Sequence, residues 1–279
     1  MARHVLGLSG GKDSAALAIY MKENYPDTPS DDIFTDTGEE LPEVYEFLGK
    51  LECYLGKPIN YINNDKTFEF LLKKNNNFLP SPQSRWCTIQ MKLVPFYDWI
   101  KPSLDAGEKV YSYVAIRIDE PSRSGLLTNR DNLKVVMPFR EDGIDKAGVM
   151  DILESSGLGL PKYYDWRSRS GCTFCFFQQK IEWVGLLEHH PEAFIRAMEL
   201  EKTSIEDGTP FTWSQGESLA ELSKPERVAQ IKRDFEARKK SAEAKRKVNP
   251  LRVGLEEELD IDTIYGCMEG KGSCAFCMK

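Results

Sequence analysis

"LGLSGGKDSAAL", residues 6–17, passes from an apolar run typical of a buried strand into a polar turn and then into helix-forming residues. Two adjacent glycines let a backbone approach a ligand closely. The helix that follows presents unpaired N–H groups and the positive end of its dipole. Together with the lysine and the two hydroxyl groups, this turn predicts a cradle for phosphate groups. Its residues are Ser9, Gly10, Gly11, Lys12, Asp13 and Ser14.

Composition excludes several classes of protein. The chain has 279 residues, of which 41% are hydrophobic and 29% charged, as in an ordinary globular enzyme. No apolar run reaches the roughly 18 residues of a membrane span, and no signal peptide precedes the first strand-like segment. We therefore expect a cytoplasmic protein without membrane contact. The net charge of −7 argues against a broad nucleic-acid surface, and the basic segment 238–247 is a local exception.

Beyond the loop, apolar runs alternate with helix-like segments through the first half of the chain. The predicted strands are 4–8, 32–35, 58–62, 110–116 and 135–139, and the predicted helices between them are 13–24, 41–55, 68–73 and 88–100. This alternation predicts an α/β fold, a doubly wound and mainly parallel sheet of the Rossmann type with helices on both faces.

The pattern changes after Pro161, where helices are predicted at 178–189, 192–201 and 217–248. We therefore expect two domains. Residues 1–180 form the phosphate-binding α/β domain, and residues 181–279 form a helical region that ends in a cysteine-rich tail.

The segment SGGKDS resembles the PP-loop of the adenine nucleotide α-hydrolase superfamily, and it lacks the GxxxxGK[ST] spacing of a Walker P-loop. The resemblance implies that the domain 1–180 binds ATP, which such enzymes cleave between the α and β phosphates, or a related adenylyl nucleotide. It also implies that Lys12 and Asp13 are catalytic, and that Asp13 helps to hold Mg²⁺.

Two further segments resemble the phosphoadenosine phosphosulfate (PAPS) reductase family. "FTDTGEELPEVYEFL", residues 34–48, is similar to that family's "DTG…PETY" segment, and it places Asp36, Thr37 and Gly38 at the end of the second strand. "VAIRIDEPSR", residues 114–123, is similar to a strand-end segment of the same family. The resemblance, which extends over about residues 4–180, implies that Arg117 and Arg123 converge on the phosphates or sulfate of the nucleotide.

Seven cysteines in a cytosolic protein favour metal or redox chemistry over structural disulfides. Cys53 is the exception, because its place in an amphipathic helix beside Leu51 predicts a buried structural thiol. The motif CxxC occurs at Cys172 and Cys175 and again at Cys274 and Cys277, a pattern that also suits zinc.

"RWCTIQMKLVP", residues 85–95, resembles the "CCxxRKVxPL" segment of iron–sulfur adenylylsulfate reductases. The resemblance implies a [4Fe–4S] cluster on Cys87, Cys172 and Cys175. Thr88 stands where that family has its second cysteine, so one ligand is missing, and Cys267 is our candidate for it. Cys274 and Cys277 remain alternative ligands or a persulfide or redox pair. Zinc and purely redox thiols stay open as alternatives to the cluster.

Three functions follow from these resemblances. The first is an ATP pyrophosphatase that activates an acceptor for sulfur insertion, similar in kind to the PP-loop proteins of Dnd- and Ssp-type DNA phosphorothioation. It implies a cysteine desulfurase as sulfur donor and DNA as an acceptor, reached directly or through partner proteins. The second is a PAPS or adenylylsulfate reductase that releases sulfite, although the chain has no "ECGLH" segment. The third is a non-catalytic nucleotide-binding regulator.

Overall fold

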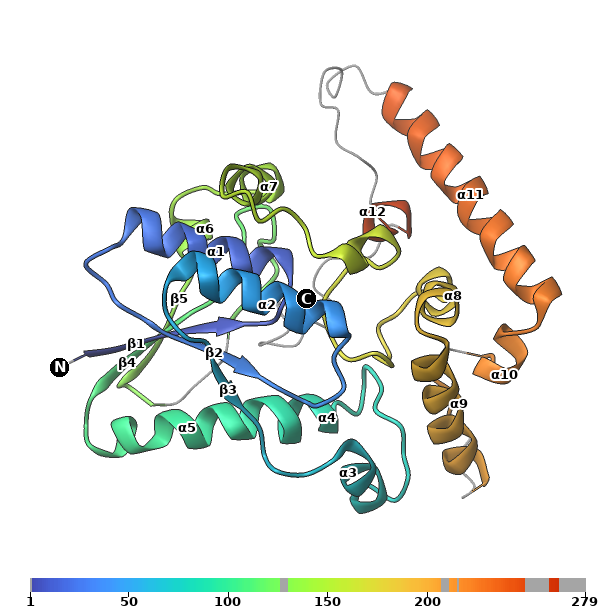
Figure 1. Ribbon diagram of the computed structural model, residues 1–279, viewed down its shortest axis with the longest axis horizontal. Coiled ribbons are helices and arrows are strands. Elements are labelled where there is room, and N and C mark those ends of the chain that lie inside the picture. The colour runs from blue at the N-terminus through green and yellow to red at the C-terminus, as the bar shows by residue number, and fades with distance from the viewer. Residues whose placement is uncertain (1, 126–129, 207–210, 215, 249–260, 266–279) are drawn as a thin grey trace.

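The computed structural model describes residues 2–125, 130–206, 211–214, 216–248 and 261–265 (Figure 1). Its centre is a five-stranded sheet in the order β3-β2-β1-β4-β5, in which every neighbouring pair is parallel. The strands are β1 (Ala2–Leu8), β2 (Asp31–Thr35), β3 (Asn60–Ile62), β4 (Lys109–Tyr113) and β5 (Leu133–Val136). The predicted doubly wound α/β fold is confirmed, and the strand order reverses direction between β1 and β4.

Helices cover both faces of this sheet (Figure 1). Helices α1, α2 and α7 lie on one face and α5 on the other. The elements of this part of the chain are α1 (Lys12–Asn24), α2 (Pro42–Leu55), α3 (Phe68–Lys74), α4 (Trp86–Thr88), the π-helix η1 (Ile89–Leu93), α5 (Val94–Asp105), α6 (Pro138–Glu141), α7 (Lys146–Ser155) and the 3₁₀ helix η2 (Lys162–Asp165).

The alternation of side chains along the strands builds a core on each face. On β1, Val5 packs toward α5, whereas Leu6 and Leu8 pack toward α1 and α2. On β2, Ile33 and Phe34 divide in the same way. Successive strand residues point to opposite faces, so a strand buried on both faces reads as a continuous apolar run. This is why the strands could be recognised in the sequence.

The C-terminal region consists of helices beside the sheet domain (Figure 1). They are α8 (Lys180–His189), α9 (Pro191–Glu206), α10 (Leu219–Leu222), α11 (Pro225–Val248) and α12 (Ile261–Tyr265). Among the described residues, none of the helices combines the length and the apolar character needed to cross a lipid bilayer. The domain division at residue 180 stays a prediction.

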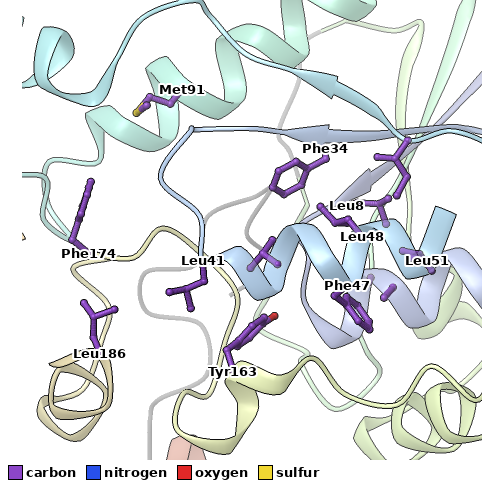
Figure 2. Packing of buried hydrophobic residues seen from close by; sticks show 14 of the residues in the cluster. Leu8, Phe34, Leu41, Phe47, Leu48, Leu51, Met91, Tyr163, Phe174 and Leu186 are labelled. Atoms are coloured by element: carbon purple, nitrogen blue, oxygen red, sulfur yellow. The ribbon is translucent and has the colours of Figure 1, made fainter. Parts of the chain in front are cut away.

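A segment before the first CxxC motif joins the core on the α1/α2 face. Tyr163 of η2 is fully buried and belongs to the same apolar cluster as Leu41 and Phe47. Figure 2 shows its ring in the same packed region as these two side chains. This packing brings η2 and the residues that follow it to the end of the sheet.

Two predicted elements differ because a proline begins a new helix. The strand predicted at 135–139 stops at Val136, since Pro138 begins α6. The helix predicted at 217–248 is divided into α10 and α11, and Pro225 begins α11. Proline suits the first helical turn, where its missing N–H leaves no hydrogen bond unmade.

The helix predicted at 88–100 is longer and irregular. Helical backbone runs from Trp86 to Asp105, with the π-helix η1 directly before Pro95. Proline has no N–H to donate to the preceding turn, which favours a local change of helix type there.

Cys53 is exposed, so the prediction of a buried thiol is wrong. Helix α2 buries the face that carries Val44, Leu48 and Leu51. Position 53 is two residues from Leu51, about 200° around the helix, and therefore points away from that face.

Candidate active site

The loop Ser9–Ser14 follows β1 and includes the first residues of α1, Lys12 to Ser14, at the carboxyl end of the sheet. Its backbone leaves no room for side chains at the two glycines. Gly10 has φ +69°, and a Cβ there would lie 2.5 Å from Cγ1 of Val44. A Cβ on Gly11 would lie 2.7 Å from Oγ of Ser170. Gly11 is also the N-cap of α1 and offers no side-chain cap. The start of α1 is thus left without a side-chain cap, an arrangement that suits an anion, and the phosphate cradle stays a prediction.

The hydroxyl groups of the loop hold its own backbone. The Ser9 N–H donates to Oγ of Ser14 at 3.1 Å, and the Ser14 hydroxyl donates to the Gly11 carbonyl at 3.2 Å. The Gly11 N–H donates to Oγ of Ser9 at 3.3 Å. These contacts keep the loop in one shape, which favours a ligand that fits it without rearrangement.

Two tyrosines that we did not single out from the sequence support the loop from outside. The Tyr163 hydroxyl donates to the Gly10 carbonyl at 2.7 Å, and the Lys12 N–H donates to the Tyr164 hydroxyl at 3.2 Å. The Lys12 ammonium lies 4.9 Å from the centre of the Tyr164 ring. The only signal in the sequence is an aromatic pair ahead of the CxxC motif, and no spacing rule connects that pair to a loop some 150 residues earlier.

Arg117 connects the end of β4 to the start of α1. Its Nη1 donates to Oδ1 of Asp13 at 2.7 Å, and its Nε donates to Oδ1 of Asp119 at 2.8 Å. Arg117 is 1% exposed. The loop and Arg117 thus lie at the reversal of strand order between β1 and β4, where open α/β sheets bind their ligands.

Arg123 lies farther along the same segment and pairs with Glu120. Its Nη1 is 2.8 Å from both carboxylate oxygens of that buried residue. Arg140 donates to the carbonyls of Glu120 and Arg123 at 2.7 and 2.9 Å, which holds this turn together. Contact of Arg117 or Arg123 with the phosphates or sulfate of a nucleotide stays a prediction.

The turn Asp36–Thr37–Gly38 follows β2 and lies beside the CxxC segment. Oδ1 of Asp36 accepts from the Gly38 N–H and from the Tyr45 hydroxyl, both at 2.8 Å. Oγ1 of Thr37 lies 3.3 Å from Sγ of Cys172. The structure therefore brings the second predicted motif and the first CxxC motif together.

The backbone of the CxxC segment is fixed against the end of β2. Cys172 pairs with Glu40 in an antiparallel bridge, and the Thr173 N–H donates to the Glu39 carbonyl at 2.7 Å. Arg167, fully buried, donates from Nη2 to the Cys172 carbonyl at 2.8 Å. The position of Cys172 is thus set by backbone contacts.

Glu40 and Lys92 surround the Cys172 thiol, and Glu40 was missed in the sequence. Oε1 of Glu40 is 3.8 Å from Sγ of Cys172 and 3.5 Å from Nζ of Lys92. Burial raises the pKa of the Cys172 thiol well above its ordinary value, the Glu40 charge raises it further, and Lys92 lowers it. At neutral pH this environment favours the protonated thiol.

The predicted cluster ligands are only partly described. Cys87 lies in α4, and Cys172 and Cys175 follow η2, whereas Cys267, Cys274 and Cys277 lie outside the described residues. Within the described ranges, no group of three or more His, Cys, Asp or Glu side chains is arranged to hold a metal ion. The described cysteines by themselves therefore do not fit a cluster or a zinc ion, and both sites stay predictions.

Comparisons with known proteins found similarities to part of this chain. Residues 3–124 match the phosphoadenosine phosphosulfate reductase domain. An uncharacterized 37.8 kDa protein in the gpa 5′ region of Escherichia phage 186 is 26% identical over 257 residues, with coverage of 71% of this chain and 74% of that protein. The crystal structure of PAPS reductase from Candida auris, in its phosphate complex, is 14% identical, with a TM-score of 0.46 and coverage of 62% of this chain and 81% of that chain.

Proposed function

We infer that this chain is an ATP pyrophosphatase that activates an acceptor for sulfur insertion. Its residues 3–124 match the PAPS reductase domain, which belongs to the adenine nucleotide α-hydrolase superfamily. The observation that carries the proposal is that the segment with the first CxxC motif contacts both the phosphate loop and the turn after β2. The Ser170 hydroxyl lies 3.3 Å from Oγ of Ser9, and Sγ of Cys172 lies 3.3 Å from the Thr37 hydroxyl. This supports a site in which the predicted nucleotide loop and a cysteine lie at one edge of the sheet.

In the first step, the loop binds the phosphates of the nucleotide. An acceptor oxygen forms a bond to the α-phosphorus, the bond from that phosphorus to the bridging oxygen breaks, and pyrophosphate leaves with the electron pair. The N–H groups at the start of α1 and the Lys12 ammonium offset the charge that gathers on the leaving group. Arg117 holds Asp13 at the first turn of α1 by its 2.7 Å hydrogen bond, and Mg²⁺, held with the help of Asp13, would neutralise part of the phosphate charge.

In the second step, sulfur replaces the activated oxygen. The terminal sulfur of a persulfide, supplied by a donor such as a cysteine desulfurase, forms a bond to the acceptor atom, and AMP leaves with the oxygen. A further thiol then attacks the disulfide that joins acceptor and donor, which leaves the sulfur on the acceptor and a disulfide on the donor side. DNA, directly or through a partner protein, is the acceptor we propose.

Pyrophosphate release from ATP tests the first step. We expect the full chain to release pyrophosphate in the presence of acceptor DNA, and Lys12→Ala to lower the rate about a hundredfold, since it removes a cation from the leaving-group site. Lys22→Ala is the matched control, because Lys22 lies on the same helix and is exposed. We expect its rate to stay within about twofold of the wild type. Equal rates for the two variants would contradict the role of the loop.

A PAPS or adenylylsulfate reductase is the second candidate, supported by the name of the matched domain. It predicts sulfite formation from either nucleotide with thioredoxin as reductant. Sulfite without any pyrophosphate release from ATP would replace the pyrophosphatase proposal. Nucleotide binding without either product would favour a non-catalytic regulator.

A further inference from the structure

A cavity of about 990 Å³ lies beside the phosphate loop and shares with it Lys12 and Tyr164, whose hydroxyl accepts from the Lys12 N–H. One wall comes from α7 and η2, and the other from α8, α11 and α12. Lys12 lies at the junction, because it belongs to the loop and also lines the cavity. The volume is at the upper end of the range for small-molecule sites, about 300–1,000 Å³.

The side chains that line this cavity have a positive net charge, whereas the whole chain has a negative one. The lining has six cationic side chains and four acidic ones, whereas the chain has 37 Lys and Arg against 44 Asp and Glu. The cations come from both walls, with Lys146 and Lys162 on one side and Lys239 on the other, where Lys232 is paired with Glu188 of the same lining. This arrangement suits a ligand with more than one negative charge.

An aromatic wall stands among these cations, and the fold holds it in place. Trp166 stacks on His189 with their ring centres 5.5 Å apart and an interplanar angle of 12°. A Cβ on Gly185 would lie 2.5 Å from the Trp166 indole, so the glycine makes the seat for that ring. Phe235 of α11 lines the opposite side. Flat rings among cations are the combination that binds nucleotides of single strands.

We propose that the cavity binds a nucleotide unit of a single-stranded nucleic acid, with its phosphate groups against the lysines and a base against the aromatic wall. This part of the proposal rests on the proposed function: the strand is the acceptor, and it reaches the ATP at the phosphate loop by passing Lys12. The matched segment 3–124 contributes Lys12, whereas the other lining residues lie between 146 and 264. The acceptor site is therefore built by the part of the chain outside the matched domain.

A strand explains the surroundings of the cavity better than a free nucleotide. Lys239 lines the cavity and belongs to the basic segment 238–247, which continues along α11. Arg238 of the same segment packs on the Tyr265 ring of α12 at 5.1 Å, so the basic segment is held against another element of the cavity wall. Lys240, exposed next to Lys239 on α11, adds positive charge where a polyanion would leave the cavity.

Fluorescence anisotropy with the full chain and a labelled single-stranded oligonucleotide tests the proposal. Lys239→Glu and Lys162→Glu, one from each wall, are compared with Arg233→Glu. Arg233 is the matched control because it is exposed on the same helix as Lys239, does not line the cavity and lies outside the basic segment 238–247. We expect about a tenfold loss of affinity for each cavity variant and less than about a twofold loss for the control.

DNA and RNA strands of one sequence distinguish the two sources of this chemistry, and free AMP is the third arm. Tighter binding of either strand than of AMP, with the Lys239/Arg233 difference, supports the proposal. Equal losses in Lys239→Glu and Arg233→Glu, or AMP binding as tightly as both strands, would overturn it. If the strand binds with the expected difference but ATP yields no pyrophosphate, the cavity assignment stands and the proposed function fails. If ATP yields pyrophosphate but the cavity variants bind the strand as the control does, the cavity assignment fails and the proposed function stands.

Discussion

At the scale of single residues, the site depends on positions where a side chain is excluded. Gly10 combines a left-handed backbone with a Cβ position 2.5 Å from Val44, which is itself fully buried. A residue with a Cβ atom is less stable by about 1–2 kcal/mol in that backbone region. Val44 belongs to the core of α2 and cannot move away without disturbing that packing. The loop shape is therefore fixed by a helix from another part of the chain.

We predict that Gly10→Ala lowers the free energy of unfolding by about 2–4 kcal/mol, because backbone strain and overlap with Val44 add up. Gly143→Ala is the matched control, since Gly143 also has positive φ (+75°) but no atom within 4 Å of the added Cβ. It is expected to cost only the strain, about 1–2 kcal/mol. Urea denaturation of both variants measures the difference, and equal losses would show that the contact with Val44 is not limiting.

At the scale of elements, one carboxylate ties together the helices that wall the cavity. Glu217, just before α10, accepts from Nζ of Lys180 at 2.7 Å and from Nη2 of Arg227 at 3.0 Å. Lys180 begins α8 and Arg227 lies in the first turn of α11. Hydrogen bonds from Arg227, opposed by burial, and the contact with Lys180 lower the pKa of Glu217 to about 2. The contacts that Glu217 makes with α8 and α11 are therefore strongest when its carboxylate is ionised.

Because the pKa of Glu217 is lower in the folded state than the ordinary value of 4.5, its ionisation stabilises the folded protein above pH 4.5. That contribution is lost as the pH falls toward 2. We predict that Glu217→Gln destabilises the protein by about 1 kcal/mol at pH 7, a value discounted for the partial exposure of the partners. The difference from wild type should shrink in thermal unfolding at pH 3. Glu236→Gln, at an exposed position of α11, is the matched control and should change the stability at pH 7 by less than about 0.5 kcal/mol. A difference for Glu217→Gln that stays constant from pH 7 to pH 3 would contradict the assignment.

At the scale of the whole molecule, a cluster would have to draw ligands from distant parts of the chain. Cys87 comes from α4, Cys172 and Cys175 from the segment after η2, and Cys267 from beyond α12. Since the described residues include no group of three ligands, their arrangement supplies at most two of the four ligands, and a cluster in this arrangement requires at least two cysteines of the tail. The tail cysteines and the sheet domain would then be joined through the metal site.

Iron and acid-labile sulfide analysis of anaerobically purified protein tests this requirement. We predict that Cys172→Ser and Cys267→Ser lose most of both, because each removes one of four thiolate ligands. Cys53→Ser is the control, since Cys53 is exposed on α2, and it should keep the wild-type content. Zinc in place of iron and sulfide would favour the alternative site, and full iron content in Cys267→Ser would rule that residue out as a ligand.

The sequence by itself determined the strands, the glycine loop and the motif after β2, because these follow from alternation, periodicity and the backbone freedom of glycine within a few neighbouring residues. The contacts that complete the site are of another kind. Tyr163 reaches Gly10 across 153 positions and Arg117 reaches Asp13 across 104. The outward position of Cys53 and the cavity beside Lys12 likewise depend on which helix faces pack together. Only the tertiary structure decided them, because no local spacing encodes which distant segments come into contact.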